Sequence, residues 1–119
     1  MVKKLNLSKY KKRYCFDLDG VICRTKKNYY IKSKPIKSAI NTINKLYQEG
    51  NYIFIYTSRF MGRSKENTKL ANKKGYKLTL SQLKKWDLKF HKLLMGKPSY
   101  DVLVDDKAVG FSSNWYKKL

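Results

Sequence analysis

Cysteine is scarce in this 119-residue chain, and no long apolar run is present. Cys15 and Cys23 are too few for a disulfide scaffold or a zinc site, and Cys15, inside an apolar run, is expected to be a small core residue. No apolar run approaches the roughly 20 residues that span a bilayer. The first lysines are not followed by the apolar stretch of a secretory signal. These absences argue against a membrane partner and predict a cytoplasmic location.

Histidine is rare, and the chain has no internal repeats or low-complexity linkers. The single histidine, His91, lies beside the short apolar run 93–95 and is expected to be structural. With no sign of a domain boundary, we expect one domain over residues 1–119. Within it, residues 1–12 are predicted to form a short basic arm, and residues 20–34 a flap.

Arginine is rare although the formal net charge is +20, since 24 of the 28 basic residues are lysines spread along the chain. Side chains that recognise nucleic-acid bases or bind a phosphate through two hydrogen bonds are more often arginine than lysine. A solvated lysine-rich surface is therefore the favoured interpretation, and it would also steer anionic small substrates. Nucleic-acid binding through the basic surface stays open as an alternative.

Acidic residues number only eight, and four of them form two pairs, Asp17 with Asp19 and Asp105 with Asp106. Each pair closes an apolar run. Gly20 permits a sharp exit from the first run, so that both carboxylates can turn toward one point. A divalent cation with oxygen ligands is the natural explanation of such pairs in a basic protein.

The order of apolar runs predicts an α/β fold. Strands are expected over residues 13–17 (buried on both faces), 52–56, 93–95 and 101–104, and helices over residues 35–48, 64–74 and 80–86. Gly50 and Gly75 are expected to end the first two helices. Thr79 and Gln82 are expected to form a capping box for the third. Trp115 and Tyr116 are expected to pack back onto the sheet.

Polar residues follow all four predicted strands, where open α/β sheets bind ligands. In a parallel sheet these ends share one edge, so the following groups should converge: Asp17, Asp19, Thr57, Lys97, Asp105 and Asp106. Such a set suits phosphoryl transfer. A carboxylate can attack phosphorus, a second can transfer protons, Mg²⁺ can neutralise the phosphate, and hydroxyl and ammonium groups can hold its oxygens.

The chain resembles the haloacid dehalogenase (HAD) superfamily of phosphohydrolases. FDLDGV, the threonine that ends YIFIYT, Lys97 and VLVDD match its four motifs in order. Through IYTSR, GKP and VDDKA the chain is most similar to the small, capless capsule-biosynthesis phosphatases. The resemblance implies a Rossmann-like three-layer α/β/α fold with a mostly parallel sheet and no large cap domain.

The resemblance also implies roles for residues. Asp17 would be the nucleophile that forms an aspartyl-phosphate, and Asp19 the general acid/base. Thr57 and the backbone amide of Ser58 would bind the phosphate, and Lys97 would pair with the phosphate and Asp17. Mg²⁺ would be held by Asp17, the Asp19 carbonyl and Asp106. Asp105 would lie behind these ligands or contact the ion through a water molecule. Arg59 and Arg63 are candidate substrate contacts without a matching motif.

Three functions stay open at this stage. The first is a Mg²⁺-dependent phosphomonoesterase acting on a small phosphorylated metabolite, such as a sugar, polyol or amino-alcohol phosphate in capsule or surface-polysaccharide synthesis. The second is a polynucleotide 3′-phosphatase, and the third is a non-catalytic basic binding module. The stretches 20–34 and 57–92 are too short for a cap domain. The site would therefore be open, or a neighbouring subunit of a homo-oligomer would cover it.

Overall fold

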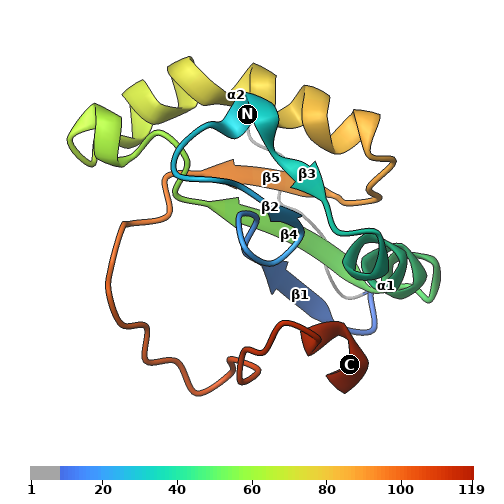
Figure 1. Ribbon diagram of the computed structural model, residues 1–119. Coiled ribbons are helices and arrows are strands. Elements are labelled where there is room, and N and C mark those ends of the chain that lie inside the picture. The colour runs from blue at the N-terminus through green and yellow to red at the C-terminus, as the bar shows by residue number, and fades with distance from the viewer. Residues whose placement is uncertain (1–8) are drawn as a thin grey trace.

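The computed structural model describes residues 9–119, and a three-stranded parallel sheet with two helices forms its framework. The sheet has the order β1-β4-β5, with β1 at Arg13–Phe16, β4 at Tyr52–Thr57 and β5 at Lys92–Met95. Its strands point the same way, so their carboxyl ends share one edge (Figure 1). The predicted βαβ order is thus confirmed for three strands.

Helix α1, at Lys37–Gln48, connects β1 to β4 and confirms the helix predicted over residues 35–48. Its buried residues are Ala39, Ile40 and Ile43, which lie on one helical face. Pro35 belongs instead to β3 (Lys34–Pro35), and Gly50 follows the helix with a φ of +96°. A glycine in this left-handed conformation ends the helix without steric cost.

Helix α2, at Thr68–Lys85, corrects the two-helix prediction for residues 64–74 and 80–86. Gly75 lies inside the helix because the helix packs closely against Phe60. A Cβ at Gly75 would come within 2.2 Å of the Phe60 ring carbon Cδ2. The Asn67 side chain accepts the Leu70 amide at 3.1 Å and begins the helix. Thr79 is buried in its interior rather than acting as a cap.

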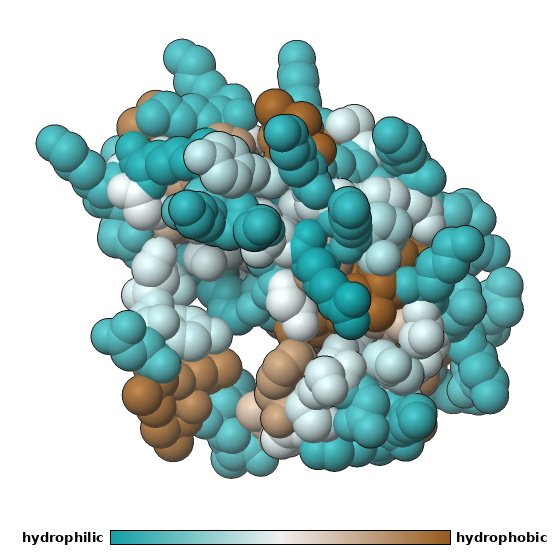
Figure 2. Space-filling view, viewed as in Figure 1, coloured by the Kyte–Doolittle hydropathy of each residue, from teal (hydrophilic) through white to brown (hydrophobic). Residues whose placement is uncertain are grey.

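The fourth predicted strand is wrong in this structure. Residues 96–114 form an extended segment without strand pairing that bows away from the sheet (Figure 1). Val102 is 78% exposed and Val104 is 93% exposed. In the space-filling view, hydrophobic residues gather at the lower left, where this segment runs (Figure 2).

Strand β1 is consequently an edge strand in the described part of the chain, with β4 as its partner. Tyr14 and Phe16 pack on the core, whereas Arg13 and Cys15 are exposed. The predictions that this strand is buried on both faces and that Cys15 is a core residue are therefore wrong. An unpaired edge leaves one side of the strand open to water.

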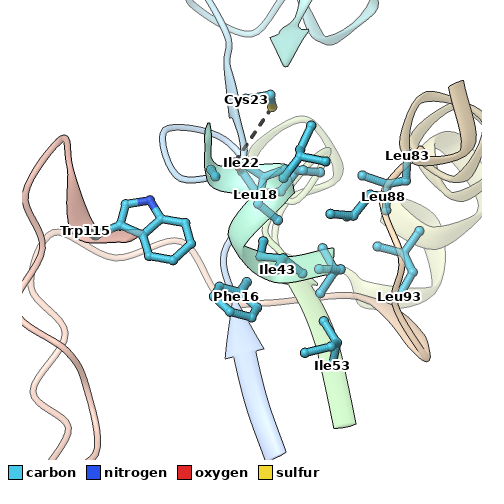
Figure 3. Packing of buried hydrophobic residues seen from close by; sticks show 13 residues of the cluster. Phe16, Leu18, Ile22, Cys23, Ile43, Ile53, Leu83, Leu88, Leu93 and Trp115 are labelled. Atoms are coloured by element: carbon cyan, nitrogen blue, oxygen red, sulfur yellow. Dashed lines mark hydrogen bonds between the residues drawn. The ribbon is translucent and has the colours of Figure 1, made fainter. Parts of the chain in front are cut away.

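The hydrophobic core lies between the sheet and α1 and also takes in Leu83 of α2, the loop after β1 and the C-terminal tail (Figure 3). Leu18 and Ile22 of that loop are fully buried. The Trp115 ring lies 5.4 Å from the Phe16 ring, and its Nε1 donates to the Val21 carbonyl at 3.1 Å. The predicted packing of the tail is confirmed for Trp115, while Phe111 stays 63% exposed.

Two further sequence predictions concern the N-terminal arm and His91. Of the predicted arm, residues 1–8 lie outside the described residues, while the Tyr10 ring contacts the Tyr52 ring with centroids 5.0 Å apart. His91 has structural contacts, since its Nδ1 accepts the Ile53 amide at 3.0 Å. Within residues 9–119, no helix is both long and apolar enough to cross a bilayer.

Candidate active site

The loop after β1 places Asp17 and Asp19 at the carboxyl edge of the sheet. The Leu18 carbonyl accepts the amides of Val21 and Ile22, which closes a tight turn. Gly20 has a φ of +87°, a conformation that glycine adopts readily. Leu18, between the two aspartates, is fully buried, whereas Asp17 and Asp19 stay partly exposed. The turn therefore anchors the loop in the core and leaves both carboxylates at the surface.

Asp17 and Lys97 form an ion pair at this edge, as the sequence predicted. Lys97 Nζ lies 3.6 Å from Asp17 Oδ2, and Asp17 Oδ1 accepts the Leu18 amide at 2.8 Å. The Lys97 amide donates to the Thr57 carbonyl at 3.1 Å, which fixes Lys97 beside the end of β4. Residues 80 positions apart thus meet because β4 lies between β1 and β5.

The two partners have shifted pKa values. Burial raises the pKa of the Asp17 carboxyl above its ordinary value, although the Lys97 charge and the Leu18 amide oppose this. Burial also disfavours the charged form of Lys97, but a hydrogen bond with Tyr100 and the Asp17 charge outweigh it and raise the Lys97 pKa. Lys97 therefore stays cationic beside the partly exposed Asp17 carboxylate.

Asp19 has a different partner, Arg59. The Arg59 Nε donates to Asp19 Oδ2 at 2.9 Å, and its Nη2 donates to Oδ1 at 2.9 Å. Arg59 is 1% exposed, so a substrate cannot reach its guanidinium in this structure. The predicted substrate contact is therefore corrected. Because arginine is seldom buried without partners, its burial indicates a role inside the protein.

The Arg59 guanidinium also donates to Cys23 Sγ at 3.6 Å and to three side-chain oxygens. It donates to the Gln82 side-chain oxygen at 2.5 Å, to the Ser33 hydroxyl at 3.1 Å and to the Thr79 hydroxyl at 3.4 Å. Gln82 and Thr79 come from α2, and Ser33 comes from the flap. One buried cation thus links the loop after β1, the flap and α2.

The predicted flap, residues 20–34, is a small hairpin held by polar contacts. Its strands β2 (Cys23–Arg24) and β3 (Lys34–Pro35) pair antiparallel. The Thr25 hydroxyl donates to Asp19 Oδ1 at 2.5 Å and lies 2.6 Å from the Ser33 hydroxyl. The Gln82 amide donates to the Tyr30 carbonyl at 2.5 Å. The sequence did not indicate that these residues hold the flap, because single polar residues without motif spacing do not reveal contacts between distant segments.

The remaining predicted phosphate and substrate contacts lie at or near the end of β4. Thr57 is 1% exposed, and its hydroxyl accepts the Arg59 amide at 3.1 Å. Ser58 is half-buried and faces a cavity. Arg63 donates to the Asn28 carbonyl, and its guanidinium lies 5.0 Å from the Tyr30 ring centroid. Arg63 therefore holds the flap in this structure rather than facing the site.

A cavity of about 430 Å³ opens between the flap and the strand ends. Its volume lies within the range of small-molecule sites. The lining residues come from the loop after β1, the flap and the end of β4, and they are Asp19, Gly20, Arg24, Thr25, Lys27, Asn28, Tyr30 and Ser58.

Asp105 and Asp106 do not join the other carboxylates as predicted, because the fourth strand does not form. Both are exposed, and Asp105 Oδ1 accepts the Lys107 amide at 2.9 Å. Residues 9–119 contain no group of three or more His, Cys, Asp or Glu residues placed to hold a metal ion. The structure thus brings together Asp17, Asp19 and Lys97 but leaves the second acidic pair on the extended segment.

Comparison with known proteins gives a fold and no family. No family model matches the chain, and no curated protein does. The crystal structure of an MCSG target from Vibrio cholerae is similar, with a TM-score of 0.77 and 23% sequence identity. The match covers 90% of this chain and 98% of that one. The chain therefore shares an α/β fold, built on a parallel sheet, with that protein.

Proposed function

We propose that this protein is a phosphomonoesterase of the haloacid dehalogenase type that works through an aspartyl-phosphate. The observation that carries the proposal is the Asp17–Lys97 pair at the carboxyl edge of a parallel sheet, with Asp19 two residues away beside a cavity. A carboxylate at such an edge next to an ammonium group can attack a phosphate that the ammonium group attracts. The four sequence motifs support the same chemistry.

Two displacements at phosphorus complete the proposed reaction. In the first, an Asp17 oxygen bonds to phosphorus, the ester P–O bond breaks, and the leaving oxygen takes a proton from Asp19. In the second, a water oxygen bonds to phosphorus and gives a proton to the Asp19 carboxylate, and the bond between phosphorus and Asp17 breaks. Lys97 offsets negative charge on the phosphate in both steps. The net change is hydrolysis of one phosphate ester.

Asp19 has one oxygen suited to proton transfer. Its Oδ1 has the Thr25 hydroxyl at 2.5 Å and the Arg59 Nη2 at 2.9 Å, whereas for Oδ2 the closest donor in the described chain is Arg59 Nε. Since Asp19 also lines the cavity, Oδ2 is the oxygen that we assign to the proton. Arg59 fixes the orientation of the carboxylate through its two hydrogen bonds.

The magnesium site expected from the sequence does not fit the residues as this structure places them. The ligands expected from the resemblance are Asp17, the Asp19 carbonyl and Asp106, and the loop after β1 supplies only the first two. Asp105 and Asp106 lie on the exposed segment. We therefore derive no step through a metal ion. The Mg²⁺ requirement stays a prediction that the activity assay addresses.

The proposed substrate is a small phosphorylated metabolite, such as a sugar, polyol or amino-alcohol phosphate. The modest cavity volume supports a small molecule. No separate cap domain is inserted in residues 9–119, since the stretch between β1 and α1 holds the flap and the stretch between β4 and β5 holds α2. A role in capsule or surface-polysaccharide synthesis follows from the family resemblance alone and is part of this proposal.

A phosphatase screen tests the function. The wild-type protein and Asp17→Asn would be assayed on p-nitrophenyl phosphate, glycerol phosphate, a hexose phosphate and a 3′-phosphorylated oligonucleotide, each with Mg²⁺ and with a chelator. We expect turnover of a small ester, and a loss of at least about a thousandfold in kcat for Asp17→Asn, because asparagine cannot form the aspartyl-phosphate.

Asp87→Asn is the matched control, since it makes the same chemical change at an exposed residue after α2 whose left-handed φ of +57° asparagine tolerates. It should keep wild-type turnover. Equal activity in wild type and Asp17→Asn would contradict the proposal. A preference for the oligonucleotide with steep salt dependence would favour the polynucleotide phosphatase instead.

A further inference from the structure

The cavity beside Asp19 has an excess of positive charge. Its charged lining residues are Arg24, Lys27 and Asp19. Asp19 is already paired with the buried Arg59 at 2.9 Å, so its charge is largely offset. Within residues 9–119 neither Arg24 nor Lys27 forms an ion pair, and Asp19 is the acidic residue of the cavity lining. An anion in the cavity would therefore be attracted rather than repelled.

The flap that carries these cations is fixed on both sides. Thr25, next to Arg24, binds Asp19 and Ser33 through its hydroxyl. Asn28, next to Lys27, accepts a hydrogen bond from Arg63 through its carbonyl. The backbone beside each cation is thus held before a ligand arrives, which lowers the entropic cost of binding.

Neutral groups complete the lining. Ser58, Tyr30 and Asn28, which have uncharged polar side chains, also line the cavity. Hydrophilic residues cover most of this face of the molecule (Figure 2). This lining can form hydrogen bonds with the polar middle part of a substrate that has an anionic group at each end. It offers few favourable contacts to an apolar substrate.

We infer that the substrate carries a second anionic group, a carboxylate or another phosphate, which Arg24 and Lys27 bind in the cavity while the scissile phosphate lies at Asp17 and Lys97. This inference rests on the proposed phosphatase function. Arg24 and Lys27 are then specificity-determining residues, and the preferred substrates are small phosphomonoesters with two acidic ends.

A matched pair of ligands tests the inference. 2-Phosphoglycerate differs from glycerol 2-phosphate by a carboxylate in place of one hydroxymethyl group. Binding of each to Asp17→Asn would be measured by calorimetry, and hydrolysis of each by the protein with Asp17 intact. We expect the carboxylate to tighten binding about tenfold. The double variant Arg24→Gln/Lys27→Gln should remove that preference.

Lys73→Gln/Lys77→Gln is the control, since it removes two charges from exposed positions on α2. It should keep the preference for 2-phosphoglycerate. Equal binding of the two ligands, binding of neither, or the same loss of preference in both double variants would overturn the inference. Preferential binding without hydrolysis of either ester would uphold the anionic subsite and count against the phosphatase.

Discussion

Arg59 joins three parts of the molecule through one buried guanidinium. It binds Asp19 after β1, Ser33 in the flap, and Thr79 and Gln82 in α2. Its guanidinium also lies 4.8 Å from the Tyr30 ring centroid. Removing it would leave polar groups from three elements without their shared donor. A buried polar group that loses its hydrogen-bond partner lowers the stability of the fold more than an exposed group does, because water cannot replace the partner.

Arg59→Ala should therefore destabilise the protein by about 3 kcal/mol, near the lower end for a broken buried pair because Asp19 keeps some contact with water. Urea unfolding followed by circular dichroism measures this free energy. Arg63→Ala, at an exposed arginine that also holds the flap, is the control and should cost about 1 kcal/mol or less. Equal losses in the two variants would contradict the role given to Arg59.

The order of apolar runs predicted that Asp17 and Lys97 converge, because both follow strands of one parallel sheet, and the family resemblance implied that they pair. Neither predicted the buried position of Arg59. Arginine is mostly exposed in proteins, and Gln82 and Ser33 lie 23 and 26 positions away in the chain. A buried polar network depends on contacts between elements, which local patterns do not contain.

At the scale of elements, helix α2 also depends on a contact that the local sequence pattern did not predict. Glycine commonly ends a helix, so Gly75 predicted a break. In the structure Gly75 is buried inside the helix, and the Phe60 ring occupies the space where a Cβ would be. The absence of a side chain thus permits close packing rather than a helix end.

Gly75→Ala should destabilise the protein by about 1–2 kcal/mol, because the added methyl group must displace Phe60 and this cost exceeds the gain in helix propensity. Gly62→Ala is the control, since a Cβ there meets nothing within 4 Å. Thermal unfolding of both variants measures the difference. An increase in stability for Gly75→Ala would show that Phe60 does not restrict this position.

The segment 101–104 was predicted as a strand because its apolar run resembles the other three. A strand also needs a partner, and the chain turns away after β5. Gly96 has a φ of +94°, and Pro98 offers no amide hydrogen for pairing. The apolar pattern therefore identified residues able to form a strand but not whether they pair in this structure.

At the scale of the whole molecule, the order of strands and helices predicted the parallel α/β arrangement, which the structure and its similarity to the Vibrio cholerae protein support. The net charge of +20 did not indicate where charge matters. Only the fold shows that Arg24 and Lys27 line a cavity, whereas Lys73 and Lys77 lie exposed on α2. The composition determines the net charge of the protein, but the fold determines where the charged side chains lie.

The central claim is that Asp17 carries the phosphoryl group during turnover. Trapping that intermediate tests it most directly: the protein is mixed with a ³²P-labelled ester that it hydrolyses, quenched in acid within milliseconds, digested and analysed by mass spectrometry. The account predicts a labelled peptide with the phosphate on Asp17, and no label in Asp17→Asn. Turnover with the label on another residue, or full turnover by Asp17→Asn, would contradict it.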